Sequence, residues 1–239
     1  MTLSQQWVIL SELMYGSEFI KELADLLREL GVRTIIECGC GGGHVLHGLA
    51  ERGFTGVGID ADEEMIDIAT ARHSHPAIEF RKLDWRKARE LARTFDAVIC
   101  RGNSLTNVGG WGKGDIFDPG RCRMEIGRSL KEMLAALKSG GLLYLDTISQ
   151  HEIDQGGGHL NLSFLGYSMA VDITHDWFRR TRVIEGKGIV RGQQFQNRSL
   201  SYLLAPNEME GLVRGLGVKR VLRPNLAAEP NYDIICAVK

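Results

Sequence analysis

The sequence predicts an α/β fold with a mostly parallel sheet, and three observations indicate this. The apolar, β-branched run 34–38 breaks at once into glycines, and a helical pattern over 45–50 follows it. Strand and helix patterns then alternate as far as Thr147, which places helices on both faces of a parallel sheet. Beyond Thr147 the pattern changes to strand-like pieces between residues 162 and 204, so we expect an antiparallel insertion there.

The individual elements follow from hydrophobic period and from helix start and stop signals. Gly31 ends the first helix, Asp62 caps the helix after the second strand, and Pro206 suits the start of the last helix. Gly186-Lys187-Gly188 predicts a hairpin turn. The expected helices are 7–30, 45–50, 63–71, 86–93, 120–138 and 207–215. The expected strands of the main sheet are 34–38, 55–60, 78–83, 95–100, 142–146, 219–223 and 233–238, and those of the insertion are 164–173, 177–184, 189–195 and 198–204.

The length of 239 residues suits one domain over residues 1–239. Within it we expect an N-terminal helical cap over 1–31 and an antiparallel insertion on the substrate side over 148–204. Residues 101–120 form a long loop rich in Gly and Asn, and long loops are often functional.

Composition argues against several classes of protein. The net charge is −1, so there is no overall basic field to attract nucleic acid, and no apolar run approaches the length of a membrane span. Residues 1–11 lack the features of a signal peptide, which predicts a cytoplasmic location. The five cysteines lack the C-x-x-C spacing of redox or zinc sites, so we expect reduced structural thiols.

The glycine spacing indicates the ligand of the first loop. Gly39, Gly41 and Gly43 read G-x-G-x-G, whereas a dinucleotide loop needs its third glycine where His44 stands. Glu37 before the glycines would repel a diphosphate and suits a ligand with an ammonium group. An oxidoreductase that uses a nicotinamide cofactor is therefore disfavoured.

Polar residues also stand at the ends of successive predicted strands. Glu37, Asp60, Asp84 and Arg101 lie at or just beyond the carboxyl ends of four strands. Open α/β sheets bind their ligands at this edge. We therefore expect the four side chains to surround one site.

These motifs resemble the class I methyltransferases, which bind S-adenosylmethionine. The resemblance spans roughly residues 20–147 and the last strands, and it implies a Rossmann-like fold with a seven-stranded, mostly parallel sheet. It implies that the glycine loop bends round the methionine part of the cofactor, that Asp60 accepts hydrogen bonds from the ribose hydroxyls, and that Asp84 faces the adenine amino group. The residues expected to hold the cofactor are Glu37, Gly39, Gly41, Gly43, Asp60, Ala61, Met65, Asp84, Trp85 and Arg101.

The segment after the fourth strand is similar to the glycine and sarcosine N-methyltransferases. Gly102-Asn103-Ser104 matches positions that touch the methyl acceptor in that family, and residues 198–206 resemble its stretch before the last helix. Asn103 offers a neutral donor and acceptor to orient an amine. The chain departs from the family where Asp146-Thr147-Ile148 lacks an arginine for a substrate carboxylate, and where Arg101 replaces an apolar residue. Arg101 is free to replace the missing cation, or to pair with Glu37 or with the cofactor carboxylate.

Other side chains are weaker candidates for the acceptor pocket. Tyr15 is a candidate to close over the site, Trp111 lies in the long loop, and His151 is a candidate general base after the fifth strand. The residues expected to contact the acceptor are Tyr15, Gly102, Asn103, Asn107, Trp111 and Tyr202, and the expected catalytic residues are Asn103 and His151. No pattern supports a metal site.

The sequence therefore predicts a small-molecule N-methyltransferase acting on an amino-acid-like amine or an amino sugar. No paired base is evident, which favours nitrogen over oxygen, but a small-molecule O-methyltransferase that uses His151 is the nearest alternative. A non-catalytic cofactor-binding protein is an alternative from another class. The expected product is S-adenosylhomocysteine, and the expected partner is a small acceptor, without nucleic acid or membrane. A homo-oligomer is left open, as is the role of the insertion as pocket cap or dimer contact.

Overall fold

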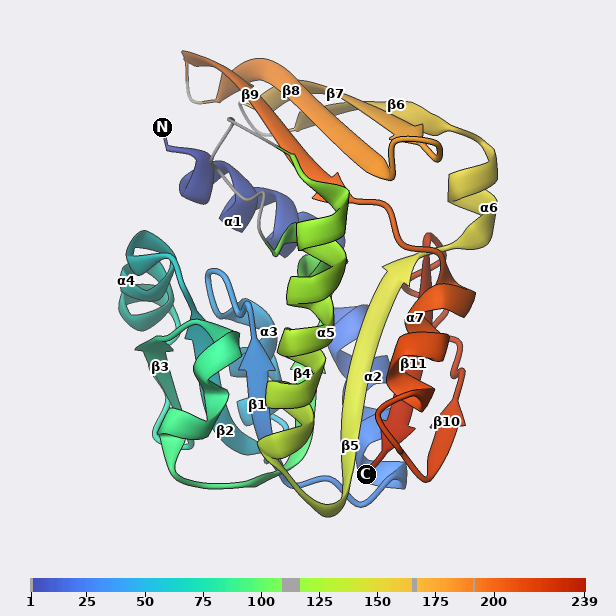
Figure 1. The fold of residues 1–239 in the computed structure, drawn as a ribbon. Helices are drawn as coiled ribbons and strands as arrows, with labels where there is room; N and C mark the ends of the chain where they lie inside the picture. Colours follow the sequence, from blue (N-terminus) through green and yellow to red (C-terminus); the bar gives the residue numbers. More distant parts are fainter. Residues whose placement is uncertain (1, 109–116, 165–166, 191) are drawn as a thin grey trace.

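A seven-stranded sheet and a separate four-stranded sheet contain the strands of the described residues (Figure 1). The structure is a computed structural model that describes residues 2–108, 117–164, 167–190 and 192–239. The main sheet has the order β10-β11-β5-β4-β1-β2-β3. Its strands are β1 (Thr34–Cys38), β2 (Thr55–Asp60), β3 (Ile78–Lys82), β4 (Phe95–Cys100), β5 (Leu137–Ile148), β10 (Arg220–Leu222) and β11 (Tyr232–Val238).

Strands β1 to β5 run parallel, whereas β11 runs antiparallel to both β5 and β10. The register places Glu37 opposite both Gly58 and Ile99, so the carboxyl ends of β1, β2 and β4 lie at one edge of the sheet. The predicted α/β class with a mostly parallel sheet is therefore confirmed.

Helices cover both faces of the main sheet, and each face has its own apolar core. Residues from Phe19 to Leu27 pack with Ile35, Ile99 and Tyr144 on one face, whereas Ile126 to Leu134 pack with Ile36, Val98 and Leu143 on the other. The first face carries α2 (Ser17–Glu29), α3 (His44–Ala50) and α4 (Glu63–Arg72). The second face carries the 3₁₀ segment η1 (Trp85–Leu91), α5 (Pro119–Ala135) and α7 (Pro206–Arg214).

The antiparallel sheet lies across the carboxyl ends of the main sheet, with α1 (Leu3–Met14) beneath it (Figure 1). It follows β5 and the short helix α6 (Gln150–Asp154), and it leads into α7. Its strands pair in sequence order and are β6 (Gly157–Phe164), β7 (Tyr167–Asp176), β8 (Thr181–Val190) and β9 (Gln193–Tyr202). The insertion expected after the fifth strand is confirmed as this sheet.

The prediction of one long N-terminal helix is wrong. The chain leaves helical geometry at Tyr15 (φ −112°, ψ 63°) and Gly16 (φ −70°, ψ −171°), so α1 and α2 are separate helices. The break allows α2 to pack on the main sheet while α1 turns toward the antiparallel sheet (Figure 1). Similarly, the charged segment expected as a helix over 86–93 is the 3₁₀ segment η1, with non-helical geometry at Lys87.

The predicted hairpin turn at Gly186-Lys187-Gly188 is also wrong, because these residues lie inside β8. The two glycines permit close approach of neighbouring strands. A Cβ at Gly188 would lie 2.1 Å from the carbonyl oxygen of Ser168, and one at Gly186 would lie 2.6 Å from Oδ1 of Asn197. Glycine inside a strand often marks such an approach, which sequence pattern alone does not separate from a turn.

All five cysteines are free and buried, as expected of structural thiols. They are Cys38, Cys40, Cys100, Cys122 and Cys236, and none belongs to the antiparallel sheet. Among the helices of the described ranges, none has the length and apolar character needed to cross a membrane.

Candidate active site at the carboxyl ends of the parallel strands

The glycine loop between β1 and α3 turns back on the neighbouring strand. The backbone N–H groups of Gly39 and Cys40 both donate to the carbonyl oxygen of Ile59, at 2.8 and 3.0 Å. Gly39, Gly41 and Gly43 have φ of +73°, +52° and +82°. At two of these positions a side chain has no room. A Cβ at Gly43 would lie 2.6 Å from Cζ of Phe80, and one at Gly39 would lie 2.9 Å from the ring of Trp85.

Asp60, at the end of β2, fixes the loop through its carboxylate. Oδ2 accepts the N–H of Gly41 at 3.0 Å, and Oδ1 accepts the N–H of Asp62 at 2.9 Å. Each oxygen keeps a second lone pair for a ligand. A Cβ at Gly41 would meet no atom closer than Sδ of Met65 at 4.0 Å, so the loop is open at this glycine.

Glu37 and Arg101 form a buried ion pair beside the loop. Nε of Arg101 donates to Oε1 of Glu37 at 2.8 Å, and the two side chains are only 6% and 1% exposed. Oε2 of Glu37 is buried without a partner in the described structure. Burial raises the pKa of Glu37, and the positive charge of Arg101 opposes that shift. Of the alternatives left open for Arg101, the structure shows the pair with Glu37.

Tyr15, at the break between α1 and α2, lies under Arg101. The Arg101 guanidinium carbon stands 4.4 Å from the centre of the Tyr15 ring, a cation–π geometry. A Cβ at Gly102 would lie 3.0 Å from the Tyr15 hydroxyl oxygen. The structure therefore brings Tyr15, Arg101 and Gly102 together at the end of β4.

Asp84 and Trp85 follow β3 and contact different groups. The Asp84 carboxylate pairs with Arg86, which also donates to Glu125 at 2.7 Å, so its oxygens are engaged within the protein. The Trp85 ring packs against Gly39, and its Nε1 donates to Oγ of Ser129 at 3.0 Å. Trp85 therefore lines the glycine loop, whereas Asp84 is turned toward η1. Ala61 follows Asp60 and is exposed.

Helix α1 covers the glycine loop and bonds both to the segment that follows β2 and to the antiparallel sheet. A Cβ at Gly42 would lie 2.8 Å from a methyl group of Val8, which is buried in α1. Oγ of Ser4 donates to Asp62 at 2.7 Å, and Asn197 of β9 donates to Gln6. No residue of this helix is among the predicted site residues, because these contacts join residues that are distant in sequence.

The loop after β4 is held by Asp146 of β5. Its carboxylate accepts the backbone N–H groups of Gly102 at 2.7 Å and Asn103 at 2.6 Å. Gly102 and Asn103 both have positive φ, +67° and +56°. A non-glycine residue seldom adopts this conformation, and such strained residues cluster at functional sites.

Hydrogen-bond counting assigns the orientation of the Asn103 amide. The Thr147 hydroxyl oxygen lies 3.0 Å from the carbonyl oxygen of Leu204 and 3.3 Å from Oδ1 of Asn103, but it has one proton to donate. Because the Leu204 carbonyl only accepts, that proton belongs to Leu204, and Asn103 is better placed with its NH₂ group donating to Thr147. This orientation turns the Asn103 carbonyl oxygen to the buried position where Nδ2 stands without a partner.

A second buried carboxyl group lies near Asp146. Glu229 is 4% exposed, accepts from the Tyr144 hydroxyl at 3.3 Å, and lies close enough to Asp146 for their charges to interact. Burial raises the pKa of both carboxyl groups, and for Glu229 the neighbouring Asp146 raises it further. The surroundings of the loop after β4 therefore contain two buried carboxyl groups.

The other residues predicted to contact the acceptor or to act in catalysis are not all brought to the same place. Tyr202 is buried and packs with Leu105 and Val108, while Asn107 ends the 3₁₀ segment η2 (Ser104–Asn107). His151 is exposed on α6, and its Nε2 contacts Gln155 of the same helix at 2.8 Å. Trp111 lies outside the described residues.

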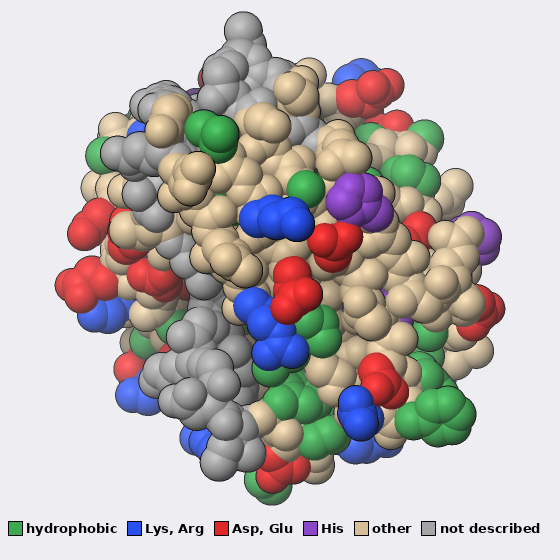
Figure 2. All heavy atoms as spheres, turned by 90° about the horizontal axis from the view of Figure 1, so that it is seen from above, with side chains coloured by type: hydrophobic (Ala, Val, Ile, Leu, Met, Phe, Trp, Pro, Cys, Tyr) green, Lys and Arg blue, Asp and Glu red, His purple; other side chains and the backbone are tan. Residues whose placement is uncertain are grey.

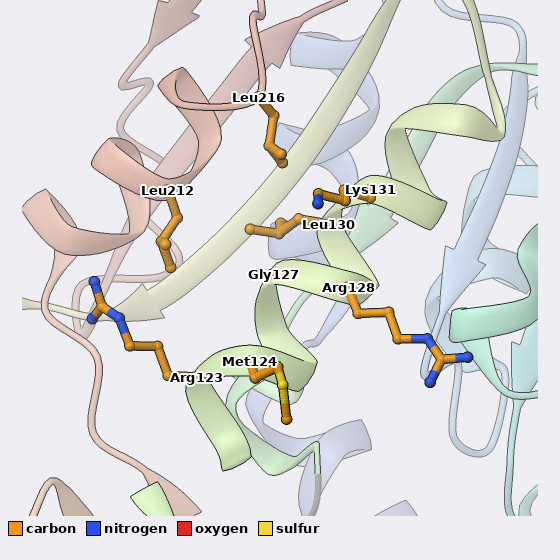
Figure 3. A pocket seen from close by; sticks show the side chains of 8 residues that line it. All are labelled: Arg123, Met124, Gly127, Arg128, Leu130, Lys131, Leu212 and Leu216. Atoms are coloured by element: carbon orange, nitrogen blue, oxygen red, sulfur yellow. The ribbon is translucent and has the colours of Figure 1, made fainter. Parts of the chain in front are cut away.

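A shallow groove of about 320 Å³ lies elsewhere, on the outer side of α5. Figure 3 shows Leu212 and Leu216 facing Leu130 across it, with the long side chains of Arg123 and Arg128 at its margins. It contains no polar residue of the carboxyl edge of the sheet, so we do not assign the reaction to it.

The outer face of the antiparallel sheet is mixed in charge. Figure 2, viewed from above this sheet, shows acidic and basic side chains interspersed over the described residues. Arg179 pairs with Asp176 and Arg180 pairs with Glu208. These arginines therefore do not form a basic patch for nucleic acid.

Comparison with known proteins agrees with this geometry. A family model described as a methyltransferase domain matches residues 35–112. A glycine/sarcosine N-methyltransferase from Parasynechococcus marenigrum is 33% identical over 145 residues, which cover 59% of this chain and 46% of that protein. The chain spans about half the length of the curated relatives it matches.

Solved structures share the fold over almost the whole chain. An S-adenosylmethionine-dependent methyltransferase from Clostridium acetobutylicum has a TM-score of 0.72 at 15% identity, covering 98% of this chain and 96% of that one. An amino pentose methyltransferase from Micromonospora echinaspora has a TM-score of 0.70 at 20% identity, covering 92% and 89%.

The fold is that of the methyltransferases, and the match to the methyltransferase domain model includes the glycine loop. The chain is similar to the class I S-adenosylmethionine-dependent methyltransferases, and its predicted similarity to the glycine and sarcosine N-methyltransferases is confirmed. Within the described residues, no group of three or more His, Cys, Asp or Glu side chains is placed to hold a metal ion.

Proposed function

We propose that this chain transfers a methyl group from S-adenosylmethionine to an amine nitrogen of a small molecule. The observation that carries the proposal is the unpartnered, buried amide end of Asn103 at the acceptor loop, beside a glycine loop suited to the cofactor. Relatives named as glycine/sarcosine N-methyltransferases and a structural neighbour named as a sugar N-methyltransferase support nitrogen as the acceptor.

The residues of the glycine loop fit the cofactor. Oε2 of Glu37 is buried without a partner and suits an ammonium group, and Asp60 keeps lone pairs for ribose hydroxyls. Met65 and Trp85 give apolar walls on either side of the loop. When bound, S-adenosylmethionine supplies a methyl group already activated on a sulfonium sulfur.

The structure gives less support to a direct contact between Asp84 and the cofactor. Its carboxylate is engaged by Arg86, so contact with the adenine amino group requires it to share its oxygens or to turn. Asp84 also accepts the backbone N–H of Arg86 at 2.8 Å and thereby starts η1. Its contribution includes placing Trp85 against Gly39.

Asn103 then orients the acceptor. With its NH₂ group on Thr147, its carbonyl oxygen accepts an N–H of the amine and directs the nitrogen lone pair away from that bond. Positioning of this kind supplies much of the rate enhancement in a displacement on an activated group. An amine needs no strong base once it is neutral, and His151 lies exposed on α6.

The test is release of S-adenosylhomocysteine from purified protein and S-adenosylmethionine across matched amines, amino acids, amino sugars and hydroxyl compounds. Asn103→Ala should lose turnover and keep cofactor affinity, whereas Asp60→Ala should lose both. Cofactor binding without turnover of any amine would argue against the proposal, and turnover of hydroxyl compounds only would replace it with O-methylation.

The proposed acceptor is a small molecule, without a nucleic acid or membrane partner, and the proposed location is the cytoplasm. Interspersed charges on the antiparallel sheet and the net charge of −1 support the absence of a nucleic-acid partner.

A further inference from the structure

Arg182 of β8 is an arginine with no protein partner in a half-buried position. Its Nε is buried without a hydrogen-bond partner, and no ion pair involves it in the described part of the chain. Leaving a buried N–H group without an acceptor is costly, so this position suits a ligand that accepts a hydrogen bond. The described arginines whose side chains form no ion pair or hydrogen bond are Arg33, Arg121, Arg128, Arg182 and Arg220. Arg182 alone among these is not exposed.

Arg182 stands in a row of polar residues across three strands. The register pairs it with His175 of β7 and with Ser201 of β9, so all three side chains share one face. Nε2 of His175 and Oγ of Ser201 are also buried without partners, and Ser201 is 3% exposed. The three residues therefore hold three unsatisfied polar atoms side by side.

This row faces the main sheet. Asn197 lies on the same face of β9 as Ser201, and it bonds to Gln6 of α1 beneath the antiparallel sheet. Burial raises the pKa of Tyr232 in β11, and the nearby positive charge of Arg182 opposes the shift. Tyr232 in turn interacts with Tyr15, whose hydroxyl lies against Gly102.

The row also connects to Asn103 through the end of β9. Ser201 is followed by Tyr202, Leu203 and Leu204, and the Leu204 carbonyl accepts from the Thr147 hydroxyl that lies beside Asn103. Ser201 thus lies three residues before the carbonyl group that fixes Thr147 beside Asn103.

We propose that Arg182, Ser201 and His175 form a subsite for a carboxylate carried by the methyl acceptor. The inference rests on the proposed function and names its substrate class, an amine that also bears a carboxylate. A guanidinium binds a carboxylate through two parallel N–H groups, and the Ser201 hydroxyl adds a further donor. The row carries one arginine, which suits a monoanion better than a doubly charged phosphate.

The position after β5 does not supply this cation. Ile148 is buried with Ile153, Leu203 and Ala205, so an apolar cluster occupies the end of this strand. Arg101 is also committed, since it pairs with Glu37. Arg182 approaches from the insertion, so the carboxylate would enter from the antiparallel sheet.

The test uses protein saturated with S-adenosylhomocysteine and pairs of amines that differ only in the carboxylate. Suitable pairs are an amino acid with its carboxamide and a 2-amino-2-deoxyuronic acid with the parent amino sugar. Calorimetry gives Kd for each, and methyl transfer from S-adenosylmethionine gives KM. We expect the carboxylate member to bind more tightly. Arg182→Met should weaken it about 10- to 100-fold and change the neutral member less than about 3-fold.

Variants separate binding from folding. Arg182→Lys should restore part of the carboxylate preference, and Ser201→Ala should reduce it by about 3- to 10-fold. Arg198→Met is the matched control, because Arg198 is exposed on the opposite face of the same sheet and pairs with Glu185.

Two results would overturn the subsite. One is S-adenosylhomocysteine binding without a carboxylate preference in any pair, and the other is an equal loss for both members in Arg182→Met. Failure of the wild-type protein to bind S-adenosylhomocysteine would instead reject the proposed function itself.

Discussion

The glycine loop and the acceptor side of the site differ in whether their polar groups have hydrogen-bond partners within the protein. Around the loop, the N–H groups of Gly39, Cys40 and Gly41 and the oxygens of Asp60 are joined within the protein. On the acceptor side, Asn103 and Arg182 each keep a buried polar atom without a partner. The backbone of the loop is therefore a preformed scaffold, although Oε2 of Glu37 beside it has no partner. On the acceptor side, both Asn103 and Arg182 leave polar atoms to be satisfied by a ligand.

The largest effect should follow from breaking the scaffold at Asp60. Asp60→Ala removes the acceptor of two backbone N–H groups and the carboxylate for a ribose, so cofactor affinity should fall about 100-fold or more. Calorimetry with S-adenosylhomocysteine measures this. Asp67→Ala, on the exposed face of α4, is the control and should bind normally.

Glycine substitutions test how tightly the loop is packed. Gly43→Ala should lower the free energy of unfolding by about 2–4 kcal/mol, because strain at positive φ adds to the contact with Phe80. Gly53 has a similar φ of +91° with no atom within 4 Å, so Gly53→Ala should cost only about 1 kcal/mol. Urea unfolding compares the two variants, and equal losses would contradict a steric role for Gly43.

Thr147 sharpens the contrast on the acceptor side. Thr147→Val removes the hydroxyl that fixes the Asn103 amide, so kcat/KM for the acceptor should fall about 10-fold while cofactor affinity is kept. Thr147→Ser keeps the hydroxyl and should retain most of the activity. A parallel loss of cofactor affinity would show that the two regions are not separable.

Glu229 tests the acidity of the acceptor side. Burial raises the pKa of Glu229 in the folded protein. At a pH above the ordinary glutamate pKa, folding therefore requires uptake of a proton, and the free energy of unfolding falls as the pH rises. Glu229→Gln removes this dependence. It should raise the free energy of unfolding by about 1 kcal/mol or more at pH 8, with a smaller gain at pH 4. A gain that is independent of pH would contradict this origin.

The smallest effect should come from His151. It is exposed and contacts only Gln155 of its own helix among the described hydrogen bonds, so His151→Ala should change kcat by less than about 2-fold. Loss of turnover with normal cofactor affinity would instead favour O-methylation with His151 as the base.

The sequence predicted the glycine loop well because its determinants are local. Gly39, Gly41 and Gly43 stand within five residues, and Asp60 ends the next strand, so a strand–loop–helix pattern locates them. Their assignment to the cofactor remains a prediction that the binding experiments test.

The acceptor side was harder to predict because its contacts join residues distant in sequence. Asn103 donates to Asp146, which lies 43 positions further along the chain, and this bond depends on the adjacency of β4 and β5. Arg182 follows Arg179 and Arg180 closely in the sequence, but strand alternation turns it to the inner face. The glycines of β8 were misread for the same reason, since cross-strand crowding leaves no local signal.

The five buried cysteines can report when the parallel core of the protein opens to solvent. All five thiols are buried, and burial raises the pKa of Cys40, Cys100 and Cys122, so the native protein should resist alkylation. Because none lies in β6–β9, loosening of the antiparallel sheet alone should leave the thiols unlabelled. Pulsed alkylation followed by mass spectrometry would therefore measure how fast the parallel core becomes exposed, independently of movements of the antiparallel sheet.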